Sequence, residues 1–171
     1  MLSCRPKQIK GVPVYSFTRL KRFMIIYNVV QVGLGGLLLF MAYHFILLFG
    51  AYGLPGAFTK SILFALAIQC LIIYPAWLLA KQDVQVEVTS AKDGLTGNDM
   101  MALRKKRLIG DIWKLCALGA IIVFIAMSPG VDKGRGASVI LATAYFSFLL
   151  TSITYFQCFN YIARKNIKSL S

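Results

Sequence analysis

The chain has 171 residues, of which 58% are hydrophobic and 15% are charged, and its formal net charge is +13. Ordinary soluble domains are about 45–50% apolar and about 25% charged. This composition excludes a disordered, collagen-like or disulfide-stapled chain and argues against a soluble enzyme, so we interpret the chain as an all-α integral membrane protein, a bundle of four transmembrane helices.

The first predicted span covers residues 23–50 and follows a basic segment, residues 1–22. The span contains no Lys, Arg, Asp or Glu, and a bilayer core about 30 Å thick requires only roughly 20 apolar helical residues. Small and polar residues allow membrane helices to approach closely and to form hydrogen bonds. We therefore take five residues of this span as candidates for helix packing or for lining a pathway: Asn28, Gln31, Gly33, Gly35 and Gly36.

The second predicted span covers residues 61–80. A tight outer turn within residues 51–60, marked by Gly53 and Gly56, connects it to the first span. Gln69 lies inside the second span, where lipid offers no hydrogen-bonding partner, so its side chain must find one on another helix.

The predicted cytoplasmic loop, residues 81–108, begins with an alternation of polar and apolar residues over residues 83–89. This period is typical of a half-buried strand, and a lone strand is not stable in water. Three interpretations stay open: pairing with residues 11–17, addition to the edge of another subunit's sheet, or an extended connector at the membrane surface. In each, the contacts come from Val84, Val86 and Val88.

The rest of this loop predicts an amphipathic helix that begins near Asp99 and is capped by Thr96 or Asn98. Its basic run lies next to the membrane, where it can anchor the chain or bind acidic lipids or a protein partner. The residues of this run are Arg104, Lys105, Lys106 and Arg107.

The third and fourth predicted spans cover residues 109–127 and 137–163, followed by a basic tail, residues 164–171. In the third, Asp111 and Lys114 have a spacing that favours an ion pair. The fourth carries a stripe of small and polar residues that either packs helices or lines a narrow polar path or pocket. The residues of the fourth span that we single out are Thr143, Ser147, Thr151, Thr154, Gln157 and Asn160.

The distribution of Lys and Arg predicts the orientation of the spans. Fifteen of these residues lie on one side of the predicted spans and three on the other. Because basic residues accumulate on the cytoplasmic side, we expect both termini there, or in the matrix of an organelle. This rule explains the net charge without nucleic-acid binding, and it predicts contact with anionic lipids in a bacterial or organellar inner membrane.

The sequence offers few groups for chemistry at membrane depth. No Asp, Glu, Lys or Arg lies in the middle of a predicted span, and the sole histidine, His44, lies in the outer half of the first. The cysteines form no Cys-x-x-Cys motif. We therefore predict no catalytic residue, no metal site and no cofactor.

These observations favour a non-catalytic membrane subunit that packs within a larger complex of different subunits. The alternative is a small homo-oligomeric transporter or channel, because four spans are few for a pathway within one chain. Its pathway would be lined by Asn28 and Gln31 and by Thr143, Ser147 and Thr151. A membrane enzyme acting on lipid or quinone is less favoured, since such a site needs ionisable groups.

Overall fold

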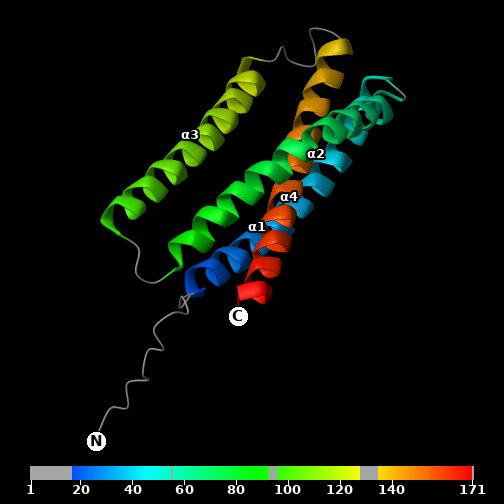
Figure 1. Ribbon diagram of the computed structural model, residues 1–171. Helices are drawn as coiled ribbons and strands as arrows, with labels where there is room; N and C mark the ends of the chain where they lie inside the picture. Colours follow the sequence, from blue (N-terminus) through cyan, green and yellow to red (C-terminus); the bar gives the residue numbers. More distant parts are fainter. Residues whose placement is uncertain (1–16, 55, 93–95, 128–134, 171) are drawn as a thin grey trace, which may run out of the picture.

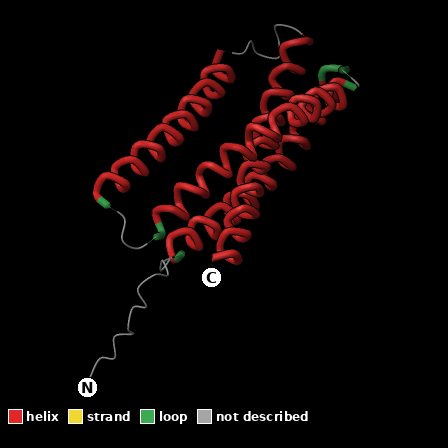
Figure 2. Tube along the Cα trace, viewed as in Figure 1, coloured by secondary structure: helices red, strands yellow, loops and turns green. Residues whose placement is uncertain are grey.

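The computed structural model describes residues 17–54, 56–92, 96–127 and 135–170, and these residues form long helices without a β-strand (Figure 2). The helices are α1 (Thr18–Ala51), α2 (Ala57–Ser90), α3 (Gly97–Met127) and α4 (Arg135–Leu170). α1, α2 and α4 pack together, and α3 lies to one side, next to α2 (Figure 1). The predicted all-α fold is confirmed for the described residues.

Three helices of the described chain, α1, α2 and α4, are long and apolar enough to cross a membrane. Only 11–17% of their most apolar stretches is buried inside the chain. Such helices suit a bilayer because their backbone groups are bonded internally and their apolar side chains are solvated by lipid. The chain therefore has the features of a multi-pass membrane protein, whereas the crossing predicted for residues 109–127 stays a prediction.

The strand predicted at residues 83–89 is wrong, because this segment is helical and belongs to α2, which continues to Ser90. The alternation in the sequence also places Val84 and Val88 four residues apart, on one face of a helix. Val84 is fully buried and packs in a cluster with Leu20 and Phe159. A helix satisfies its backbone groups internally, so neither an edge strand nor an extended connector exists here; the predicted pairing partner, residues 11–17, lies almost wholly outside the described residues.

The turn between α1 and α2 confirms the prediction from its glycines. Gly53 has φ +62°, a backbone conformation that glycine adopts without steric cost. The Gly53 amide donates to the Gly50 carbonyl at 3.1 Å, and the Leu54 amide donates to the Phe49 carbonyl at 2.9 Å. These two bonds are a Schellman motif, which satisfies the last carbonyls of α1 and reverses the chain into α2.

The start of α3 confirms Thr96, of the two predicted candidates, as the capping residue. The Asp99 amide donates to the Thr96 hydroxyl at 3.3 Å, and the Thr96 hydroxyl donates to the Asp99 carboxylate at 2.6 Å. Such reciprocal bonds resemble a capping box and also place a negative charge near the positive end of the helix dipole.

α2 packs most extensively against α4, and small residues on α2 permit this. Ala57, Ser61 and Ala65 recur at every fourth position and are all buried, and Ala76, Ala80 and Val84 repeat the pattern further along. Small residues at this spacing let two membrane helices approach closely. The spacing of these residues is visible in the sequence, but they were not among the predicted packing residues.

The core of the bundle consists of two apolar clusters at opposite ends of α2. One cluster joins Ala57 and Ala65 to Phe45 of α1 and Phe146 of α4. The other cluster joins Ala80 and Val84 to side chains of α1 and α4: Leu20, Phe159 and Ala163. Along α2, Gln69 lies between these clusters and Glu87 lies beyond the second.

Candidate functional site

A polar layer joins α2 to α4 between the two apolar clusters. The Thr151 hydroxyl donates to Gln69 Oε1 at 3.0 Å, and Gln69 Nε2 donates to the Thr154 hydroxyl at 2.7 Å. The Thr154 hydroxyl in turn donates to the Leu150 carbonyl of its own helix at 2.8 Å. Gln69 thus has the interhelical partners that its position requires, and two of the predicted stripe residues supply them.

Thr143 and Ser147 continue this stripe along α4. The Thr143 hydroxyl donates to the Val139 carbonyl at 2.8 Å and lies 3.4 Å from the Ser61 carbonyl of α2. Ser61 is buried and its hydroxyl donates to the Ala57 carbonyl at 2.9 Å. Ser147 is also buried, with 9% of its surface exposed. Of the residues Thr143, Ser147, Thr151 and Thr154, Ser147 is therefore buried and the three threonines are half-buried on the face of α4 toward α2.

We expect Gln69→Leu to weaken the contact between α2 and α4. The substitution removes two interhelical hydrogen bonds, each worth about 0.6–2 kcal/mol in a membrane protein. The thermal unfolding midpoint in mild detergent should fall by roughly 2–8 °C. Gln82→Leu is the matched control, because Gln82 is exposed on the same helix and should melt like the wild type. Equal midpoints for both variants would show that the polar layer contributes nothing to stability.

Asn28 and Asn160 link α1 to α4. Asn160 Nδ2 donates to Asn28 Oδ1 at 3.3 Å. Asn160 is buried, and its own Oδ1 has no hydrogen-bond partner among the described residues. Gln31 is half-buried and Gln157 is exposed. Of the predicted polar candidates on α1, the structure therefore brings Asn28 to another helix.

The glycine patch of α1 contacts no other helix of the described chain. A Cβ atom added at Gly33, Gly35 or Gly36 would meet nothing within 4 Å. The patch therefore leaves the α1 backbone accessible to a neighbouring molecule or to lipid.

The end of α2 carries a cluster of charged contacts that the strand interpretation missed. Because this segment is helical, Asp83 and Glu87 lie one turn apart on the same face. The Tyr155 hydroxyl of α4 donates to the Asp83 carboxylate. A Cβ atom added at Gly110 of α3 would lie 3.4 Å from Asp83 Oδ1, so α3 approaches α2 closely here. The signal was the i, i+4 spacing of the two acidic residues.

Glu87 joins α2 to both α1 and α3. Its carboxylate accepts a hydrogen bond from the Arg107 guanidinium of α3 and lies 3.7 Å from Arg19 Nε of α1. The Glu87 side chain is only 11% exposed, whereas those of Arg107 and Arg19 are 29% and 61% exposed. Glu87 is thus a shielded anion between two cations that water still reaches.

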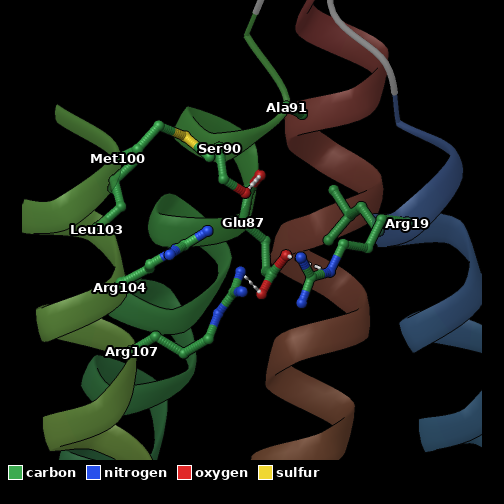
Figure 3. A pocket seen from close by; sticks show the side chains of 9 residues that line it. Arg19, Glu87, Ser90, Ala91, Met100, Leu103, Arg104 and Arg107 are labelled. Atoms are coloured by element: carbon green, nitrogen blue, oxygen red, sulfur yellow. Dashed lines mark hydrogen bonds and ion pairs between the residues drawn. The ribbon is translucent and has the colours of Figure 1, made fainter. Parts of the chain in front are cut away.

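A cavity of about 170 Å³ opens beside Glu87 (Figure 3). Arg104 and Arg107 extend into it from α3, and Arg19 enters from α1 (Figure 3). Its remaining wall is formed by residues of the three helices: Leu20, Ser90, Ala91, Met100 and Leu103. Of the predicted basic run, Arg104 and Arg107 line the cavity and Lys105 and Lys106 do not. Arg107 is half-buried, whereas the other three residues are exposed. This cavity is the candidate binding site of the chain.

The other residues with chemical potential are scattered. His44 is exposed on α1, with its ring 6.4 Å from that of Phe40. Cys70 is exposed and Cys158 is half-buried, and both are free thiols. No cluster of three or more His, Cys, Asp or Glu within the described ranges could hold a metal ion. The predicted pairing of Asp111 with Lys114 is not tested, because Lys114 lies outside the residues whose side chains are described.

Comparisons with models of protein families, with curated proteins and with solved structures found no match to this chain.

Proposed function

We propose that the chain is a non-catalytic integral membrane subunit that packs within a larger complex of different membrane proteins. In this role it buries apolar helix surface against its neighbours and carries out no reaction of its own. Both the role and the hetero-oligomeric state are inferred from how the chain uses its packing residues.

The supporting observation is a contrast between two sets of small residues. Those on α2 and α4 pack against each other inside the chain, whereas a Cβ atom at Gly33, Gly35 or Gly36 of α1 would meet nothing within 4 Å. Small residues favour close approach of membrane helices. We infer that this part of α1 packs against a helix of another subunit.

The pathway alternative has less support from the same geometry. A polar path requires side chains that face water, but the Thr151 hydroxyl donates to Gln69 and the Thr143 hydroxyl donates within its own helix. These groups act as interhelical contacts or bond their own backbone. A flux assay of the reconstituted protein remains the direct test of this alternative.

We also propose the orientation in which the basic ends of the helices face the cytoplasm or the matrix. The end of α2, the start of α3 and the end of α4 then lie near anionic lipid head groups, which attract Lys and Arg by about 1 kcal/mol per residue. Arg104, Lys105, Lys106 and Arg107 are the proposed contacts on α3.

Native mass spectrometry of the tagged protein, extracted in a mild detergent, tests the subunit role. We expect different proteins to be present at a fixed stoichiometry. Gly35→Leu should reduce their recovery about tenfold, because losing one close helix contact corresponds to roughly 1.4 kcal/mol. The chain itself should stay folded, since a Cβ atom added at Gly35 meets nothing within 4 Å.

Gly50→Leu is the matched control. Gly50 also lies on α1, and a Cβ atom there also meets nothing within 4 Å, but it is outside the Gly33–Gly36 patch. This variant should keep its partners. A clean homo-oligomer in the wild type would contradict the proposed role, and equal recovery for both variants would contradict the proposed contact.

A further inference from the structure

The cavity beside Glu87 has an excess of positive charge. Three arginine side chains line it, and Glu87 is its single acidic residue. Glu87 forms ion pairs with Arg19 and Arg107, whereas Arg104 has no ion pair with any described acidic side chain. One carboxylate cannot neutralise three guanidinium groups, so the cavity attracts an anion.

The arginines are also suited to one class of anion. A guanidinium is planar, remains charged at every physiological pH and presents several N–H donors in a fork that matches the oxygens of a phosphate. The volume of about 170 Å³ exceeds that of a single water, which occupies about 30 Å³ in the liquid. The cavity therefore has space for a phosphate group together with part of the molecule that carries it.

The position of the cavity along the helices places Arg19 at the level of the lipid head groups and Glu87 just beyond them. Glu87 lies seven residues, or about 10 Å, beyond Ala80, where the apolar run of the second predicted span ends. Arg19 lies four residues, or about 6 Å, before the first span begins at Phe23. The polar layer of a bilayer adds about 5–8 Å on each side of the hydrocarbon core. Apolar wall residues such as Leu20 and Leu103 continue toward that core.

We propose that this cavity binds the phosphate group of an anionic ligand, with Arg104 as the residue that holds it and Arg19 and Arg107 as partners shared with Glu87. The shared chemistry is a phosphate oxygen bonded to guanidinium groups, whether the phosphate belongs to a lipid head group or is free in solution. This inference rests on the membrane orientation proposed above, but it is independent of which subunits surround the chain.

Retention of lipid by the intact protein tests the proposal. The wild type and two variants are reconstituted into nanodiscs of phosphatidylcholine that contain a minor fraction of phosphatidic acid. The protein is then released, and native mass spectrometry counts the lipids that stay bound. Arg104→Gln should retain about tenfold less phosphatidic acid, the change expected for loss of one charge-assisted hydrogen bond.

Lys105→Gln is the matched control, because it removes the same charge from the next residue, which is exposed and does not line the cavity. The diffuse attraction of Lys105 to the membrane surface does not hold a lipid once the protein has been released from the nanodisc, so this variant should retain phosphatidic acid as the wild type does. Equal loss in both variants would indicate a diffuse surface field and would overturn the proposal. Retention of the same non-zero amount of phosphatidic acid by all three proteins would overturn it as well.

A second arm separates lipid from free phosphate. Inorganic phosphate is added to the detergent-solubilised protein, with sodium chloride at the same ionic strength as the reference. A rise in the unfolding midpoint for the wild type but not for Arg104→Gln, without retained lipid, supports the site and assigns it to soluble phosphates. If the midpoint does not rise and no lipid is retained, the proposal is overturned. The native mass spectra of the first arm also give the stoichiometry of any partner proteins. They therefore show whether the subunit role holds if the cavity binds neither lipid nor phosphate.

Discussion

Ala65→Leu should separate α2 from α4 and lower the thermal unfolding midpoint by roughly 2–12 °C. Ala65 has no exposed surface and lies in the apolar cluster with Phe45 and Phe146. A larger side chain in a well-packed core costs about 1–3 kcal/mol, because neighbouring groups must leave their preferred positions. Here the neighbour is a whole helix, which cannot rearrange locally. The midpoint is measured in mild detergent by fluorescence-detected size exclusion after heating.

Ala67→Leu is the control for this substitution. Ala67 is exposed and lies two residues away on the same helix, so the change adds the same apolar volume outside the interface. This variant should melt within a degree or so of the wild type, since surface substitutions rarely change stability by more than about 0.5 kcal/mol. If Ala65→Leu were equally harmless, the close approach of α2 and α4 described above would be incorrect.

Glu87→Lys should detach α3 from the end of α2. The substitution replaces the anion that joins Arg19 and Arg107 with a cation among three arginines. Removing one partner of a fully buried ion pair costs about 3–5 kcal/mol. Because both arginines remain partly exposed to water, we expect about 1–2 kcal/mol. The position of α3 should be affected more than global stability, since α3 packs less extensively on α2 than α4 does.

Distances between spin labels measure this detachment. The labels are placed at Gln85 and Lys105, two exposed positions on α2 and α3, in a chain whose native cysteines have been replaced by alanine. The distance distribution should be narrow in this background and broad in Glu87→Lys. Adding Arg107→Glu restores an ion pair with opposite polarity and should narrow the distribution again. Gln82→Lys, which adds a cation on an exposed part of α2, should leave it unchanged.

An unchanged distribution in Glu87→Lys would mean that α3 is held by other contacts. Failure of the charge swap alone would mean that the cavity requires an anion on α2 in particular. If the charge swap fails, Glu87 acts mainly by shaping the cavity. Lipid retention by Arg104→Gln then tests the phosphate site more directly than the distance measurement does.

The polar residues of α4 illustrate what periodicity predicts well. Thr143, Ser147 and Thr151 recur at every fourth position, so any helix must place them on one face, and the structure directs that face inward. Their partners were not predictable. Gln69 requires a donor and an acceptor wherever it lies, but only the packing of α2 on α4 determines that Thr151 and Thr154 supply them.

The end of α2 illustrates where periodicity misleads. Over seven residues, a period of two and a helical i, i+4 repeat can use the same valines, so Val84 and Val88 fit both. The helix prevails because it bonds its own backbone, whereas a strand needs a neighbour that the described chain does not provide. Once the segment is helical, Asp83 and Glu87 share a face, and the charged cluster follows.

The sequence by itself determined that the chain is helical, that several of its helices can cross a membrane and where α1 turns into α2. It also limited the cap of α3 to Thr96 or Asn98. These properties depend on local composition, helix period and glycine conformation, which a short stretch of sequence contains completely. Only the tertiary structure decided that α2 and α4 form the main contact, that the α1 glycines stay open, and that three arginines from α1 and α3 surround one carboxylate of α2. These depend on which helix faces which, and that choice is a balance of many weak contacts between residues far apart in the chain.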